Sequence, residues 1–465
     1  MVLGVDLKRH RLENGLVVVF DQRNGRNEAT PSIAFAGSVR AGAMFDEEGR
    51  LGTAEMVARL LNRGTQNGST SFEVAEKIEE MCATLQFSNY DESVVYTARC
   101  HVENAGRLLQ VINDCLANPS FPTEEVEKTR AEVIANLEEE KGETRTTAYR
   151  ELMALIFGKD KPYGRNTLGT LEDIVKITRE EVKGFHEAHY SPEVAILVAT
   201  GGFDQEQLLT EIEETLGKWN GGAKIRKKDY RRMNESDVTG KDLRSAADSE
   251  RSVSPARAAN HSGNEVPKLL KISMEHKSQV DLALGSRAVP RTSDEFYALN
   301  LGNLMLGHIG LYGRLGKNVR DEKGLAYYCY SMVQSKLHDG SFAIYAGVNP
   351  VNVARAIEGI THEVKRMCNE PLTDEEMSTA RKNLKGTLSI ALESSVERAN
   401  LIHDIEYFGL GLDYLDRYAS ILENVNSEDV LRLFNKCCSP NNISLVAVGP
   451  VGSSKMTLPK EITEN

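Results

Sequence analysis

Tyr190-Ser191-Pro192, followed by the apolar run Ala195-Ile196-Leu197-Val198-Ala199-Thr200-Gly201, is a segment that the chain contains twice. Its second copy is Cys438-Ser439-Pro440, followed by Ile443-Ser444-Leu445-Val446-Ala447-Val448-Gly449, and it begins 248 residues after the first. A second matched pair, Thr123-Glu124-Glu125 and Thr373-Asp374-Glu375-Glu376, has nearly the same offset. Because chance rarely gives two matches at one spacing, the sequence predicts a duplicated domain.

The two copies are separated by a charged segment, residues 221–267, which has few large apolar residues and no sustained period. Such a composition buries too little apolar surface to offset the entropy of ordering the chain. We therefore predict a flexible linker whose charges are solvated, rather than a binding patch. The predicted organisation is a first domain over residues 1–220, this linker, a second domain over residues 268–451, and a tail over residues 452–465.

Each copy combines strand and helix patterns. Helices are predicted by the capping boxes Thr70–Glu73, Thr178–Glu181 and Thr373–Glu376, and by the acidic first turn of the long segment 123–143. Strands in hairpins and helices in blocks favour an α+β fold with two homologous domains, each an antiparallel-rich sheet with helices packed on one face. The predicted strands are 16–20, 33–40, 94–99, 194–200, 271–274, 280–284, 325–333, 342–347 and 443–448.

Length and composition narrow the classes of function. A chain of 465 residues, 40% of them hydrophobic, is long enough for two or three globular domains. The net charge of -12 argues against nucleic acid and against a membrane surface as partners, because both attract clustered Lys and Arg. No apolar run approaches the ~20 residues of a membrane-spanning helix, and residues 1–21 show no signal-peptide pattern. Seven cysteines without a C-x-x-C pair favour a reducing soluble compartment such as the cytoplasm.

One predicted helix of the first copy carries polar residues at a notable spacing. A helix that begins near Thr53 buries one apolar stripe and turns Glu55 and Arg59 away from it. The acid precedes the base by four residues, which is the favourable order for an ion pair, worth about 0.3–0.5 kcal/mol on an exposed helix. Taken alone, this pattern indicates an ordinary salt-bridged surface.

The residues around this helix resemble the pitrilysin family, and within it the mitochondrial processing peptidase and its bacterial relatives. The shared frame is Val39-Arg40-Ala41-Gly42, then Phe45-Asp46, a helix and Gly64-Thr65. In active members the helix carries His-x-x-Glu-His, in which two histidines hold zinc and the glutamate activates water. Aligned on Gly64-Thr65, the histidine positions are Glu55 and Arg59, and the glutamate position is Ala58.

The family's third zinc ligand is a glutamate in a later helix, and the resemblance places that position at Asn136 or Leu137, neither of which is a carboxylate. Ala58 cannot transfer a proton, and Arg59 keeps its positive charge in proteins. The resemblance therefore implies that this chain holds no catalytic zinc and needs no cofactor of its own. We expect the Glu55–Arg59 pair to replace the metal structurally.

In the second copy, Arg320-Asp321-Glu322-Lys323-Gly324-Leu325-Ala326-Tyr327 resembles the family segment whose Arg and Tyr reach a zinc site across the chamber. The resemblance implies that Arg320 anchors a substrate carbonyl. It also implies that Tyr327 donates to the oxygen of the tetrahedral intermediate, a contact worth roughly 10²–10³ in rate. Gly307, Gly310 and Gly313 resemble the family's glycine-rich segment, which is implied to contact peptide; a flexible turn is the alternative.

A further motif, His186-x-x-His189, is interpreted as polar residues at a helix end rather than as a metal site. Two functional hypotheses remain. In the first, the chain is the non-zinc subunit of a heterodimeric zinc metallopeptidase: a homologous partner supplies zinc, this chain supplies Arg320 and Tyr327, and an extended peptide adds a strand to a sheet edge. In the second, the chain is an inactive scaffold or peptide-binding protein of the same fold, like core subunits of a respiratory complex.

Overall fold

The computed structural model describes residues 6–23, 32–221 and 269–451, so all of the predicted linker except its first residue, and the whole predicted tail, lie outside these ranges. The residues in these ranges form one six-stranded sheet, in the order β1-β2-β6-β3-β5-β4, and one five-stranded sheet, in the order β7-β11-β8-β10-β9. The strands are β1 (Leu7–Arg11), β2 (Val17–Gln22), β3 (Ser32–Val39), β4 (Thr84–Asn89), β5 (Val94–His101), β6 (Ala195–Gly201), β7 (Leu269–Ser273), β8 (Val280–Ala288), β9 (Ala326–Ser335), β10 (Gly340–Val348) and β11 (Ser444–Gly449).

The two sheets have the same topology once β1 is set aside. The repeated segment forms β6 in the first half and β11 in the second. Strand β6 pairs in parallel with β2 and antiparallel with β3. Strand β11 pairs in the same way, in parallel with β7 and antiparallel with β8. The predicted α+β fold with two antiparallel-rich sheets is therefore confirmed.

Helices cover each sheet, and their ends follow the capping signals in the sequence. Thr70, Thr178 and Thr373 each accept from the backbone N–H three residues later, while the glutamate at that position accepts from the threonine's own N–H, so all three predicted capping boxes are present. The first half contains α1 (Thr53–Leu60), α2 (Ser71–Glu80), α3 (Ala105–Ala117), α4 (Thr123–Gly142), α5 (Thr144–Phe157), α6 (Leu171–Ile174), α7 (Arg179–His189) and α8 (Gln205–Glu214). The second half contains α10 (Phe296–Asn303), α11 (Val353–Asn369), α12 (Asp374–Ala391), α13 (Ser395–Tyr407), α14 (Tyr414–Asn424) and α15 (Ser427–Cys437).

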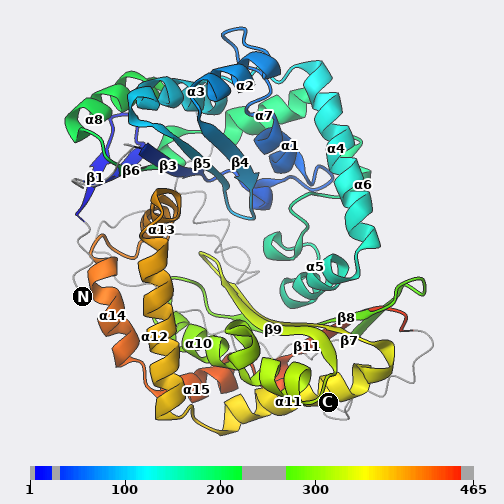
Figure 1. Cartoon of the computed structure of the whole chain (residues 1–465). Coiled ribbons are helices and arrows are strands. Elements are labelled where there is room, and N and C mark those ends of the chain that lie inside the picture. The colour runs from blue at the N-terminus through cyan, green and yellow to red at the C-terminus, as the bar shows by residue number, and fades with distance from the viewer. Residues whose placement is uncertain (1–5, 24–31, 222–268, 452–465) are drawn as a thin grey trace, which may run out of the picture.

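Two helices are exchanged between the halves, and this exchange is not predicted by the sequence pattern. Figure 1 shows the main helical layers on the outer faces of the sheets, with α5 and α13 between the sheets. Helix α5 of the first half packs Leu152 and Ile156 on the second sheet, in a cluster with Ala283 and Val446. Helix α13 of the second half packs on the first sheet in the same way, through Ala399 and Ile402. Each sheet therefore has its own helices on one face and a helix from the other half on the opposite face.

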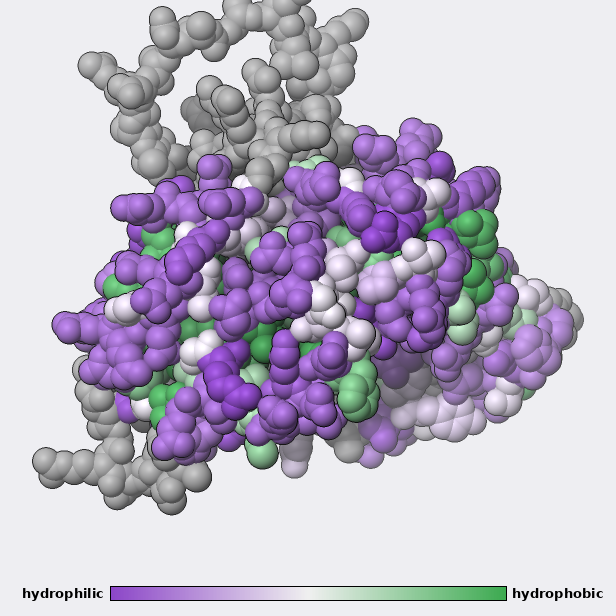
Figure 2. All heavy atoms as spheres, turned by 90° about the horizontal axis from the view of Figure 1, so that it is seen from above, coloured by the Kyte–Doolittle hydropathy of each residue, from purple (hydrophilic) through white to green (hydrophobic). Residues whose placement is uncertain are grey.

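The surface seen in Figure 2 is mostly hydrophilic, with hydrophobic residues in small separate groups. Among the helices in the described ranges, none combines the length and the apolar composition needed to cross a lipid bilayer.

Candidate functional site

Helix α1 is held at its N-terminus by a buried acid. Both oxygens of Asp46 accept backbone N–H groups, from Gly52 at 2.7 Å and from Ala54 at 2.8 Å. These contacts satisfy two of the N–H groups that a helix start leaves free. Burial raises the pKa of Asp46 to about 7, although the two N–H donors and Arg165 oppose the rise. The landmark Phe45-Asp46 thus fixes the start of the helix that carries the degenerate motif.

On α1, Glu55 and Arg59 form the ion pair that their spacing predicts, with Arg59 Nε 2.5 Å from Glu55 Oε1. The pair is only partly exposed, because Glu55 is 7% exposed whereas the side chain of Arg59 is 27% exposed. In the amide orientation that satisfies both groups, Asn136 Oδ1 on α4 accepts from Arg59 Nη2 at 3.0 Å and from Nη1 at 3.2 Å. Asn136 is therefore the α4 residue that faces α1 here, whereas Leu137 is buried in the core.

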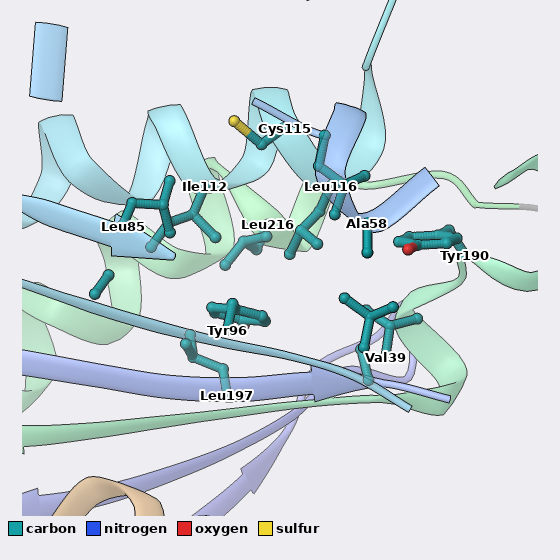
Figure 3. Close-up of a cluster of buried hydrophobic side chains, with 14 of the residues drawn as sticks. Val39, Ala58, Leu85, Tyr96, Ile112, Cys115, Leu116, Tyr190, Leu197 and Leu216 are labelled. Carbon is teal, nitrogen blue, oxygen red and sulfur yellow. The ribbon is translucent and has the colours of Figure 1, made fainter. Parts of the chain in front are cut away.

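Ala58 belongs to the hydrophobic core of the first half and is 2% exposed. Figure 3 shows it among the buried side chains, near Tyr190 and Leu116. A methyl group at this position adds to the core but can neither accept nor donate a proton.

These four residues do not fit a catalytic zinc ion. Zinc sites in proteins use imidazole, thiolate or carboxylate ligands. Here the guanidinium of Arg59 occupies the space between Glu55 and Asn136, and the one carboxylate is already bound to it. Elsewhere in the described ranges, no group of three or more His, Cys, Asp or Glu side chains is arranged to hold a metal ion.

A pocket of about 520 Å³ opens beside this ion pair. One wall is α1, with Glu55, Ala58 and Arg59, and another is β4, from Leu85 to Asn89. Among the residues that the structure describes, strand β4 is at the edge of the first sheet and pairs on one side only, with β5. The sequence prediction missed β4, although Thr84-Leu85-Gln86-Phe87 alternates in the way that strands do. The pocket joins the degenerate motif to a free sheet edge.

Arg320 and Tyr327 lie in the second half of the chain. Figure 1 shows β9, the strand that contains Tyr327, in the second sheet, whereas α1 lies beside the first sheet. Arg320 lies in the π-helical segment η8 (Gly316–Glu322), and Tyr327 is the second residue of β9. Both side chains are exposed, Tyr327 by 64%, and neither forms a hydrogen bond or ion pair with the parts of the chain that the structure describes.

Tyr327 is also the extra residue of a β-bulge. Along β9, Tyr328 pairs with Gly347 and Ala326 pairs with Val348, so Tyr327 has no partner on β10. On a regular strand Tyr327 would share the face of Cys329, which is buried under the helices. In the bulge, Ala326 packs against that core instead, and Tyr327 stays exposed.

The structure gives reasons, other than peptide contact, for glycine at the three positions predicted to touch peptide. A Cβ on Gly307 would lie 2.7 Å from the backbone nitrogen of Ser331 on β9, so this position requires close packing. Gly310 has φ of +71°, and a Cβ added there would meet nothing within 4 Å, as expected of an open turn. Gly313 packs near Gly307. Peptide contact at these glycines stays a prediction.

His186 and His189 are buried at the end of α7, and each ring has neighbours other than a metal ion. His186 Nε2 is 2.8 Å from the carbonyl oxygen of Leu116, and its ring stacks on Tyr190. The ring of His189 packs between Phe185 and Phe45. Burial lowers the pKa of each histidine to about 4, so both are neutral near pH 7. They are core residues.

Comparison with known proteins identifies the family of this chain. The family profile described as "Insulinase (Peptidase family M16)" matches residues 25–171, and that described as "Peptidase M16 inactive domain" matches residues 176–384. An uncharacterized zinc protease of Mycobacterium tuberculosis is 25% identical over 98% of this chain and 95% of its own length. A probable mitochondrial-processing peptidase subunit beta of Arabidopsis thaliana is 21% identical over 95% of this chain and 78% of its own.

Solved structures share the fold. A peptidase M16 inactive domain from Pseudomonas fluorescens superimposes with a TM-score of 0.81 at 20% identity, covering 97% of this chain and 99% of the other. A protease from Helicobacter pylori also gives a TM-score of 0.81, at 18% identity, and the match covers 96% of this chain and 100% of the other. Both halves of the chain, and not one domain alone, are therefore matched. This chain belongs to peptidase family M16, the pitrilysin family, as a member in which the zinc-binding motif is replaced.

Proposed function

We propose that this chain is the non-zinc subunit of a two-chain M16 metallopeptidase, and that it supplies Arg320 and Tyr327 to a zinc site on a homologous partner. The single observation that carries the proposal is a contrast between two sites. At the motif position the polar groups satisfy one another within the chain, through Glu55, Arg59 and Asn136. At the second site, Arg320 and Tyr327 are exposed and have no side-chain partner in the described ranges.

The roles of the two residues follow from their chemistry. A guanidinium holds a peptide carbonyl through several N–H donors, and it stays charged at any physiological pH. A phenol hydroxyl donates one hydrogen bond, and such a bond to an oxygen that gains charge in the transition state is worth roughly 10²–10³ in rate. An extended peptide that pairs with a free sheet edge, such as β4, would use backbone hydrogen bonds for affinity.

The proposed compartment is a reducing one. All seven cysteines are free thiols in the structure, and six of them are buried. Disulfides are scarce in reducing compartments, so an odd number of unpaired thiols fits such a location.

The test uses a partner that carries His-x-x-Glu-His and is encoded near this chain. The purified chain alone should show no zinc-dependent cleavage of a peptide, and the mixture should cleave it. The variant Tyr327→Phe should lower kcat of the mixture by about 10²-fold, and Arg320→Lys should mainly raise KM. Tyr90→Phe is a matched control, because Tyr90 is likewise an exposed tyrosine, 56% exposed, and lies outside both β9 and the glycine-rich segment. Full activity of the Tyr327→Phe mixture would exclude the proposed role and favour the scaffold alternative.

A further inference from the structure

Tyr328, the residue after Tyr327, is held by three separate contacts. Its hydroxyl donates to Asp281 on β8, two strands away. Its ring lies over Gly347, where an added Cβ would come within 2.4 Å of a ring carbon. The guanidinium of Arg145 lies over the ring, 4.8 Å from the ring centroid. Burial and the bond to Asp281 raise the pKa of Tyr328, so its hydroxyl stays protonated as a donor.

Asp281 is a buried junction between the two halves of the chain, since it is only 1% exposed. Besides Tyr328, it accepts from the hydroxyl of Thr144, the first residue of the exchanged helix α5, and from Gln279 Nε2 at 3.1 Å. Arg145, next along α5, donates to the hydroxyl of Tyr330 at 2.6 Å. The first turn of a first-half helix thus fixes the first residues of a second-half strand.

These contacts bear on Tyr327 because they act where the strand register shifts. The bulge lies between the pair Tyr328–Gly347 and the pair Ala326–Val348. Bulges insert one unpaired residue and re-aim its side chain. If the ring of Tyr328 were released, the strand could pair regularly, and Tyr327 would turn toward the helical core.

We infer that Tyr328, Asp281 and Arg145 are positioning residues that maintain the bulge and so keep the side chain of Tyr327 exposed. Because Arg145 belongs to helix α5, the orientation of Tyr327 then depends on the position of that helix. The inference rests on the proposed function only for the role of Tyr327 as a hydrogen-bond donor at the partner's zinc site. The geometry itself can be tested on the chain without a partner.

The first experiment places fluorotyrosine at position 327 of the full chain and records its fluorine NMR spectrum. Tyr328→Phe removes only the hydroxyl that binds Asp281, and we expect a shifted or split Tyr327 resonance. Asp281→Asn should act in the same direction. Tyr149→Phe is the matched control. It removes the hydroxyl of a tyrosine on helix α5, and this hydroxyl donates to Gln334, at the other end of β9, at 3.1 Å. An unchanged resonance in Tyr328→Phe, or an equal change in Tyr149→Phe, would overturn the inference.

The second experiment measures cleavage by the mixture with the zinc-bearing partner. Tyr328→Phe should lower kcat about tenfold and leave KM within about twofold, because misplacement of a transition-state donor acts on the chemical step. Tyr149→Phe should leave both constants unchanged. If the wild-type mixture is inactive, the proposed function fails while the NMR result still decides the positioning. If the resonance shifts and kcat does not change, the positioning holds but Tyr327 is not the transition-state donor.

Discussion

Arg398 on α13 lies against Asp21 on β2, and this contact joins the second half of the chain to the first sheet. Arg398 Nη2 is 2.8 Å from Asp21 Oδ1, and Nε binds the other carboxylate oxygen. Both residues are buried, 7% and 1% exposed. At the opposite helix, Asp281 binds Thr144 on α5. Each exchanged helix, α13 on the first sheet and α5 on the second, therefore has a polar side chain near its start that binds a buried aspartate on a strand of that sheet.

Removing one partner of this buried pair should be strongly destabilising. Arg398→Met leaves an unpaired carboxylate in the interior, and we expect a loss of about 3–5 kcal/mol in the free energy of unfolding. The matched control is Arg9→Met, because Arg9 joins β1 to Glu406 on the same helix at 2.9 Å but is 40% exposed. That variant should lose less than about 1 kcal/mol. Urea unfolding monitored by circular dichroism distinguishes the two, and equal losses would contradict the argument.

The exchange of α5 and α13 should keep the halves together after the connection between them is cut. A protease site placed within residues 222–268, followed by cleavage of the folded protein, should give two fragments that elute together in gel filtration. Ile402→Asp, which puts a charge into the cluster under α13, should cause the cleaved fragments to separate. Separation of the cleaved wild-type fragments would show that the exchanged helices do not hold the halves.

Four substitutions should rebuild a zinc site at the degenerate motif. The variant Glu55→His, Ala58→Glu, Arg59→His, Asn136→Glu removes the guanidinium and restores three ligands and a base in the positions that α1 and α4 bring together. Metal analysis after dialysis should find about one zinc per chain. The same variant with Arg59 retained is the control and should bind none, because the positive charge remains in the site. Zinc in the control would mean that these four positions are not the site.

Stability should fall in acid because of the two buried histidines. Burial lowers the pKa of His186 and of His189 to about 4, whereas an unfolded histidine titrates near pH 6.5. Between these values the unfolded chain binds protons that the folded histidines do not, so the histidines' contribution to stability is complete above about pH 6.5 and is lost as the pH falls toward 4. Asp46, whose pKa burial raises to about 7, contributes in the opposite direction and offsets about one of the two histidines. The loss is on the order of 3 kcal/mol for each histidine.

His189→Phe tests this pH dependence. The phenyl ring suits the aromatic contacts with Phe185 and Phe45, and it removes a ring nitrogen, Nδ1, that is buried without a hydrogen bond. Between pH 4 and 6.5 the free energy of unfolding of this variant should change less steeply with pH than that of the wild type, by the contribution of one histidine, about 1.4 kcal/mol per pH unit. His362→Gln replaces a histidine whose side chain is 61% exposed and serves as the control. An unchanged slope in His189→Phe would mean that His189 is not neutral in the fold.

The amino-acid sequence by itself determined the duplication, most strands, the capped helices and the chemistry lost at the motif. These features are local: a capping box or an apolar alternation acts between residues close in the chain, and Ala58 has no proton to transfer in any fold. The sequence pattern missed β1, whose residues Leu7–Arg11 are mostly polar, because an edge strand buries few side chains.

Only the tertiary structure decided which sheet each exchanged helix covers, that the buried Glu55 pairs with Arg59, which also binds Asn136, and that Tyr327 is the unpaired residue of a bulge. The apolar residues of α5 predict burial but not the surface they bury, because the hydrophobic effect is not directional. Strand register likewise depends on the partner strand, here on Gly347, which is distant in sequence. Pairing and packing between distant segments therefore set the two features on which the proposed function depends.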